Sequence, residues 1–83
     1  MKTIEINQYI VADPDICGGK PTFRGTRVMV WQVLEMLAAG ETVEQILEDF
    51  PSITREHIAA ALRHAARLTE GEKFIPFERE VVG

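Results

Sequence analysis

Basic side chains recur along residues 51–69, a segment whose apolar residues have helical spacing. It contains three arginines and two histidines against one acidic residue, and four of these are candidates for nucleic-acid contacts: Arg55, His57, Arg63 and Arg67. Arginine can bridge guanine edges or hold phosphates, and small alanines at 59 and 60 would let such a helix lie close to DNA. A polar face is also what any three-helix domain has on its last helix. On the residues alone, both interpretations stay open.

Two other motifs fail at single positions. The Gly19-Lys20 pair resembles the end of a phosphate-binding P-loop, but Pro21 stands where serine or threonine is required. Asp13-x-Asp15 has the spacing of a calcium loop, but Arg24 occupies the position of its bidentate glutamate. Neither motif therefore predicts a ligand.

No set of residues for a metal site or an active site stands out either. His57 and His64 lie about 10 Å apart along a helix, too far to share a metal without a third ligand. The single cysteine, Cys17, excludes an internal disulfide, and no neighbour in the sequence would activate its thiol. We therefore expect no metal, no cofactor and no enzymatic activity.

A small, mainly α-helical domain must position these residues. Short β-prone runs and turn residues predict a β-strand or hairpin element over residues 9–24. Apolar residues then recur at helical spacing between capping and terminating residues, which predicts three helices at about 29–39, 43–50 and 55–70. We expect a single domain over residues 1–71 and a C-terminal tail over residues 72–83.

The third predicted helix carries both core contacts and the basic face. Its expected buried stripe has six apolar members: Ile58, Ala61, Leu62, Ala65, Ala66 and Leu68. Only Pro51-Ser52-Ile53 separates it from the preceding helix, which is the short turn of a helix-turn-helix. In that motif the last helix is the recognition helix, and its early residues face a DNA groove.

Length and charge limit the possible partners. A chain of 83 residues has a small core, so a stabilising partner or self-association is expected. The formal net charge is −4, yet residues 17–34 hold three basic residues and no acidic one, whereas residues 35–50 hold five acidic residues. The charge therefore weakens non-specific DNA binding without excluding a local basic surface. No apolar run is long enough for a membrane span, and without a signal-peptide pattern we expect the cytoplasm.

One string is more specific than composition. Residues 16–28 read Ile-Cys-Gly-Gly-Lys-Pro-Thr-Phe-Arg-Gly-Thr-Arg-Val. This resembles the Gly-Gly-Lys-Pro-x-Ile-x-Gly-Thr-Arg signature of the family known as domain of unknown function 433. The similarity extends over roughly residues 9–68 and includes Leu37-Ala38-Ala39-Gly40 and Phe50-Pro51.

The resemblance implies a homeodomain-like helix-turn-helix core with an N-terminal β-element, usually dimeric. The family is similar to VapB-type antitoxins, which bind operator DNA as dimers and mask a PIN-like ribonuclease toxin with a C-terminal segment. Carried over to this chain, Arg55, His57 and Arg63 would read DNA. Three tail residues would bind the toxin: Phe74, Ile75 and Phe77.

The basic residues of the signature have no role assigned by the resemblance. Lys20, Arg24 and Arg27 are candidates for phosphate contacts or for bracing the helix that follows. The glycines of this segment and Pro21 are explained by backbone geometry.

We therefore predict a mainly α fold, with a short N-terminal β-element and a three-helix homeodomain-like helix-turn-helix core. The predicted function is an antitoxin and autorepressor that forms a homodimer or higher homo-oligomer and binds operator DNA and a PIN-like toxin. A dimer would carry two basic helices to two half-sites. The alternative is a non-catalytic protein–protein interaction module with the same trihelical core and no DNA binding.

Overall fold

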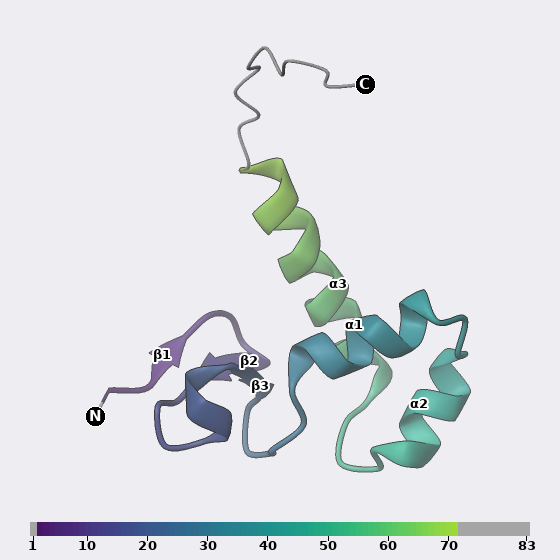
Figure 1. The fold of residues 1–83 in the computed structure, drawn as a ribbon, viewed down its shortest axis with the longest axis horizontal. Helices are drawn as coiled ribbons and strands as arrows, with labels where there is room; N and C mark the ends of the chain where they lie inside the picture. The colour runs from purple at the N-terminus through teal and green to yellow at the C-terminus, as the bar shows by residue number, and fades with distance from the viewer. Residues whose placement is uncertain (1, 72–83) are drawn as a thin grey trace, which may run out of the picture.

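Three helices follow a small antiparallel sheet in the computed structural model, which describes residues 2–71 (Figure 1). In chain order the elements are β1 (Ile4–Glu5), β2 (Ile10–Ala12), the 3-10 turn η1 (Cys17–Gly19), β3 (Pro21–Phe23), α1 (Val30–Ala38), α2 (Val43–Asp49) and α3 (Arg55–Glu70). The predicted fold class, mainly α with an N-terminal β-element, is confirmed. Among the described residues, no helix has the length and apolar character needed to cross a membrane.

The sheet has the order β1-β2-β3, and both pairs of strands are antiparallel. In the pairing of β2 with β3, Ile10 lies opposite Phe23. β1 precedes the predicted β-element and places Ile4 opposite Ala12. Because both residues of β1 are exposed, no alternation of apolar and polar residues marks this strand in the sequence.

Backbone geometry in the sequence signature carries the chain from β2 to α1. Residues 17–19 have φ angles of 52°, 66° and 86°, in the left-handed region that glycine enters without strain. Beyond β3, the Thr26 hydroxyl donates to the Phe23 carbonyl at 2.8 Å and accepts from the Val28 amide at 3.0 Å. Two tight turns therefore direct the chain into α1.

Side chains also define where α2 and α3 begin. The Thr42 hydroxyl accepts from the Gln45 amide at 3.1 Å, and the Gln45 side chain accepts from the Thr42 amide at 2.8 Å, which forms a capping box. At the start of α3, His57 Nδ1 accepts from the Thr54 amide at 3.0 Å. This hydrogen bond makes His57, a candidate DNA-reading residue, part of the cap of α3.

The core draws on β2, β3, all three helices and the turn before α3. Its buried cluster consists of Ile10, Phe23, Val30, Val33, Ile46, Ile53, Ile58 and Ala61. Packing of α3 on this cluster is confined to its first turns.

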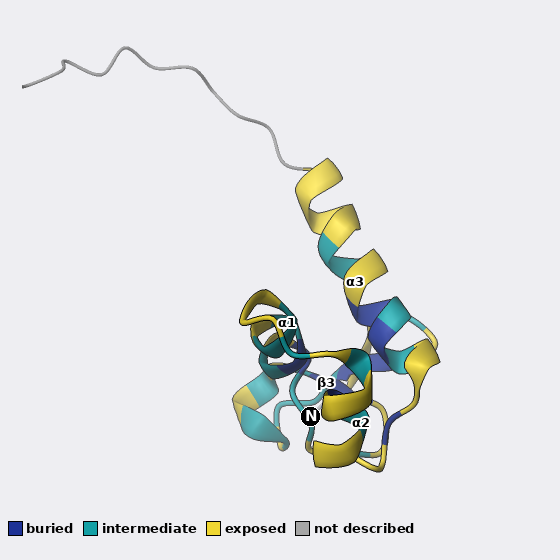
Figure 2. Cartoon of the chain, turned by 90° about the vertical axis from the view of Figure 1, so that its right-hand side faces the viewer, coloured by how far each residue is buried: buried dark blue, intermediate teal, exposed yellow. Residues whose placement is uncertain are grey.

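The predicted buried stripe of α3 is correct at Ile58 and Ala61 and wrong further along the helix. Leu62 is 49% exposed, Leu68 is 64% exposed, and Ala66 is also exposed. Figures 1 and 2 show the reason, because the C-terminal half of α3 projects beyond the other elements. Periodicity reveals which residues share a face but not how far the neighbouring elements extend along it.

Two threonines should respond oppositely to the same substitution. Thr26→Val removes both hydrogen bonds of the turn before α1, so we expect the free energy of unfolding to fall by about 1–2 kcal/mol. The Thr22 hydroxyl is fully buried and has no hydrogen-bond partner among the described residues. Thr22→Val should therefore raise stability by about 1 kcal/mol. Urea denaturation of the two variants tests both, and equal shifts would contradict this account.

Candidate functional site

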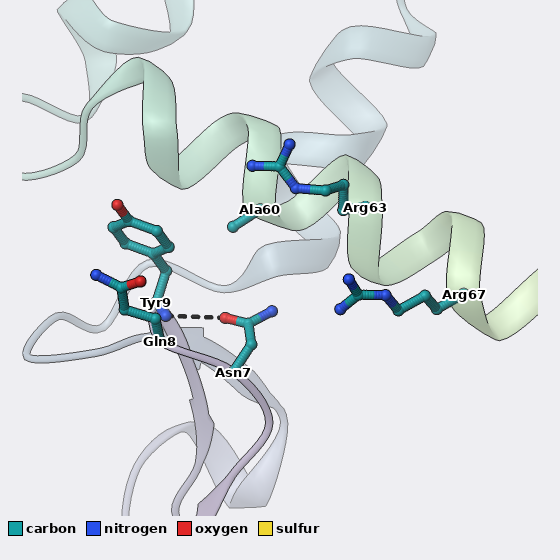
Figure 3. A pocket seen from close by; sticks show the side chains of 6 residues that line it. All are labelled: Asn7, Gln8, Tyr9, Ala60, Arg63 and Arg67. Atoms are coloured by element: carbon teal, nitrogen blue, oxygen red, sulfur yellow. Dashed lines mark hydrogen bonds between the residues drawn. The ribbon is translucent and has the colours of Figure 1, made fainter.

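Two arginines of α3 lie beside the turn that precedes β2. Arg63 and Arg67 lie one helical turn apart, and with Ala60 they line one wall of a shallow pocket of about 160 Å³. Their guanidinium groups extend toward residues 7–9, which form the opposite wall (Figure 3). Within residues 2–71 neither arginine forms an ion pair, and the Arg67–Glu70 pair that a purely structural role would favour is not formed.

The opposite wall is a turn whose conformation is fixed by Asn7. The Asn7 Oδ1 atom accepts hydrogen bonds from the Tyr9 amide at 2.8 Å and the Ile10 amide at 2.9 Å. This occupies the acceptor end of the side chain and leaves its NH₂ group as a donor. Gln8 and Tyr9 complete the wall, and none of the acidic residues that the structure describes lines the pocket. The pocket therefore combines two cations with neutral donors, which suits an oxyanion.

Arg24 braces this turn from the sheet. Its Nε donates to the Gln8 carbonyl at 3.2 Å, and its Nη2 donates to the Asn7 carbonyl at 3.4 Å. The Arg24 amide also donates to the Tyr9 carbonyl at 2.8 Å. An ion pair with Glu5, at 2.6 Å, holds the guanidinium in place. The sequence predicted that Arg24 contacts phosphate or braces the helix that follows; in this geometry Arg24 instead braces the turn before β2.

His57 is part of the packing between the sheet and α3. Its half-buried ring makes edge contacts with Tyr9, at 4.9 Å between centroids, and with Phe23, at 5.5 Å. Nδ1 lies 2.8 Å from the Thr54 hydroxyl and accepts from the Thr54 amide. The histidine predicted to read DNA thus holds the first turn of α3 against the turn that carries Tyr9.

Arg55 pairs with Glu44 of α2 across the exposed start of α3. The hydrogen bond from Arg55, the Glu44 backbone amide and the positive charge lower the pKa of Glu44, in that order of importance. The pair is therefore complete at neutral pH and is lost when the pH falls through the lowered pKa. Both side chains are well exposed, so the pair positions Arg55 at little energetic benefit.

Comparison with known proteins shows which family this chain belongs to. A family profile described as a protein of unknown function (DUF433) matches residues 10–65, most of the chain. The chain belongs to the DUF433 family. An uncharacterized protein, y4eO, of Sinorhizobium fredii is 45% identical over 58 residues, which make up 70% of this DUF433 chain and 26% of that protein. The chain thus spans about a quarter of the curated relative.

A solved structure has a similar fold. The crystal structure of a DUF433 member protein from Anabaena variabilis aligns with a TM-score of 0.70 at 28% sequence identity. The alignment covers 77% of this DUF433 chain and 63% of the other. Neither relative carries a described activity, so the function of this chain must be argued from its own residues.

The pocket crosses the edges of the family match. Arg63 lies inside residues 10–65, whereas Arg67 and the Asn7–Tyr9 turn lie outside them. Sequence reasoning identified both arginines but missed the turn. Its signal is a polar Asn7-Gln8 pair between apolar neighbours, which is typical of a side-chain-stabilised turn. Periodicity alone cannot place such a turn beside a helix that begins only at Arg55.

The remaining predicted residues of the DUF433 chain lie elsewhere. Lys20 and Arg27 are exposed and are not among the pocket residues, and Arg55 also lies outside the pocket. Phe74, Ile75 and Phe77 fall outside the described residues. Within residues 2–71, His, Cys, Asp and Glu side chains form no group of three suited to a metal, and Cys17 is a free, half-buried thiol.

The Arg55–Glu44 pair predicts a measurable titration. Arg55→Gln should raise the pKa of Glu44 toward its usual value, because the hydrogen bond that chiefly lowers it is lost. A pH titration of the Glu44 carboxyl by NMR provides the measurement. Arg67→Gln serves as the control, since this substitution removes the same charge at a residue that does not contact Glu44. An unchanged pKa in Arg55→Gln would show that the pair is not formed in solution.

Proposed function

We propose that this DUF433 chain is an antitoxin-like regulator of transcription, acting as a homodimer in the cytoplasm. In this proposal α3 of a helix-turn-helix contacts operator DNA, and the C-terminal tail binds a PIN-like ribonuclease toxin. The observation that carries the DNA-binding part is the Arg63–Arg67 face, which within residues 2–71 has no ion-pair partner and lies beside a pocket without acidic residues. The toxin-binding part rests on the resemblance of the sequence to VapB-type antitoxins.

The donor set of the pocket suits a phosphodiester. Arginine, asparagine, glutamine and tyrosine side chains are among those that contact DNA phosphates, and all four line this pocket. Arg63 and Arg67 are separated by about 6 Å along the helix axis, so each guanidinium can contact a different oxygen or phosphate. Because the turn is fixed by Asn7 and Arg24, little ordering is required on binding.

The proposed contact has the character of phosphate positioning rather than base readout. The first turn of α3, which reads bases in a helix-turn-helix, carries Arg55 in an ion pair and His57 in the packing. With a net charge of −4, the whole chain also repels DNA at a distance. We therefore expect binding that is weak on non-specific DNA and strongly dependent on salt.

Fluorescence anisotropy with a labelled duplex from the chain's own upstream region tests the DNA role. The double variant Arg63→Ala/Arg67→Ala should weaken binding at least tenfold. It should also flatten the dependence of log affinity on log salt by about two units, because two phosphate contacts are lost. The assay covers about 50–200 mM salt, over which such contacts change affinity steeply.

The matched control is Lys20→Ala/Arg27→Ala, which removes the same charge from exposed residues outside the pocket. A smaller loss in the control supports a role of the pocket itself. Equal losses of DNA affinity in the two double variants would show that the effect comes from overall charge and not from the pocket. No binding by the unaltered protein at the lowest salt would overturn the DNA role.

The toxin role is tested through the tail. Phe74→Ala/Phe77→Ala should weaken binding to a PIN-like ribonuclease encoded beside this chain at least tenfold, because large aromatic residues usually dominate such interfaces. Isothermal titration calorimetry gives the affinity. Val81→Ala/Val82→Ala is the control, since it trims apolar side chains of the same tail. Unchanged affinity in the phenylalanine variant would remove the tail assignment.

A protein–protein module without DNA binding remains the second candidate, and two observations favour it. Two of the arginines, Arg24 and Arg55, are engaged with Glu5 and Glu44. The projecting half of α3 also exposes apolar side chains, as interaction surfaces do. This candidate predicts no salt-dependent DNA binding in the anisotropy experiment, so the same measurement separates the two functions.

A further inference from the structure

Hydrogen-bond donors from two elements face one another across the arginine pocket. Figure 3 shows the Asn7 amide nitrogen pointing toward the Arg67 guanidinium, with Arg63 one helical turn away on the same wall. The Asn7 oxygen cannot take part, because it accepts from the Tyr9 and Ile10 amides. Two donors cannot bond each other, so an acceptor between Asn7 and Arg67 would satisfy both.

The residues that the structure describes do not balance the positive charge of this pocket. Neither Arg63 nor Arg67 has an ion-pair partner within residues 2–71. Glu5, which lies just before the turn, is paired with Arg24 at 2.6 Å. A ligand with two negative charges and several acceptor oxygens would neutralise both guanidinium groups and match their planar, forked donors.

We propose that the pocket is a binding site for a small, free phosphate monoester, held by Arg63, Arg67 and the Asn7 amide nitrogen. Such an ester carries about −1.5 to −2 charges at pH 7 on a single phosphate. Each phosphate of DNA carries only one charge, so a DNA strand would divide its charges between the two arginines. The pocket volume of about 160 Å³ accommodates a phosphate group, since a water molecule occupies only ~30 Å³.

Binding of the ester would regulate the proposed DNA contact. This step rests on the proposed function, because the same two arginines are assigned there to DNA phosphates. An ester in the pocket occupies both guanidinium groups, so it competes with DNA for them. The binding site itself requires no DNA and can be tested alone.

An NMR titration of the full chain at pH 7.5 and constant ionic strength tests the ligand class. Methyl phosphate should shift the Asn7 side-chain amide and the Tyr9 amide with a dissociation constant of about 1 mM, which is weak because both arginines are exposed. Dimethyl phosphate, a diester with one charge, should bind at least fivefold more weakly. Equal affinities for the two esters, or no shifts at these residues, would overturn the proposal.

The pH dependence of binding tests the charge of the ligand. Since the second pKa of a phosphate ester is about 6, only about a tenth of methyl phosphate is dianionic at pH 5. Its affinity should therefore fall severalfold between pH 7.5 and pH 5. Sulfate keeps both charges over this range and reports any change in the protein itself. If the affinities for methyl phosphate and sulfate fall equally, the preference for a dianion is refuted.

Substitution of Asn7 tests the site. Asn7→Asp keeps an oxygen for the Tyr9 and Ile10 amides but replaces the donor with a carboxylate oxygen, so methyl phosphate binding should fall at least tenfold. Ser52→Asp is the matched control, because it adds the same charge at an exposed residue outside the pocket. Circular dichroism should show that both variants are folded. Arg67→Gln, which leaves the turn intact, should also weaken binding at least fivefold, and unchanged affinity in either pocket variant contradicts the assignment.

Competition separates this inference from the proposed function. At constant ionic strength, methyl phosphate should displace the labelled duplex in the anisotropy assay at lower concentration than dimethyl phosphate does. DNA binding without any binding of methyl phosphate would overturn the small-molecule site alone. Binding of methyl phosphate by a chain that does not bind DNA would overturn the DNA role and leave this site in place.

Discussion

The ring of His57 packs against Tyr9 and Phe23, and this contact joins the first turn of α3 to the sheet beside the core contacts of Ile58 and Ala61. Phe23 is fully buried in the core, whereas Tyr9 belongs to the turn that lines the pocket. Through His57 the first turn of α3 is therefore joined to both. The capping contacts of His57 with Thr54 then set where the helix begins. From that start, helical geometry alone brings Arg63 and Arg67 over the Asn7–Tyr9 turn.

The sequence signature that is typical of the family has a structural role in this chain. Its glycines accept positive φ in η1, and Thr26 closes the turn before α1. Arg24 is drawn into the brace of the Asn7–Tyr9 turn. The most recognisable residues therefore build the scaffold, whereas part of the pocket comes from residues outside the matched segment. For this chain, the family match alone says little about binding.

Local interactions explain which features could be predicted from the sequence. The Thr42–Gln45 capping box involves two residues only three positions apart, so the sequence itself indicates it, and the structure contains it. The contact of His57 with Tyr9 joins residues 48 positions apart, and only tertiary packing creates it. The same limit applies to Leu62 and Leu68, since their helical spacing is correct but none of the elements within residues 2–71 covers them. Spacing revealed the shared face, whereas burial depended on the lengths of the other elements.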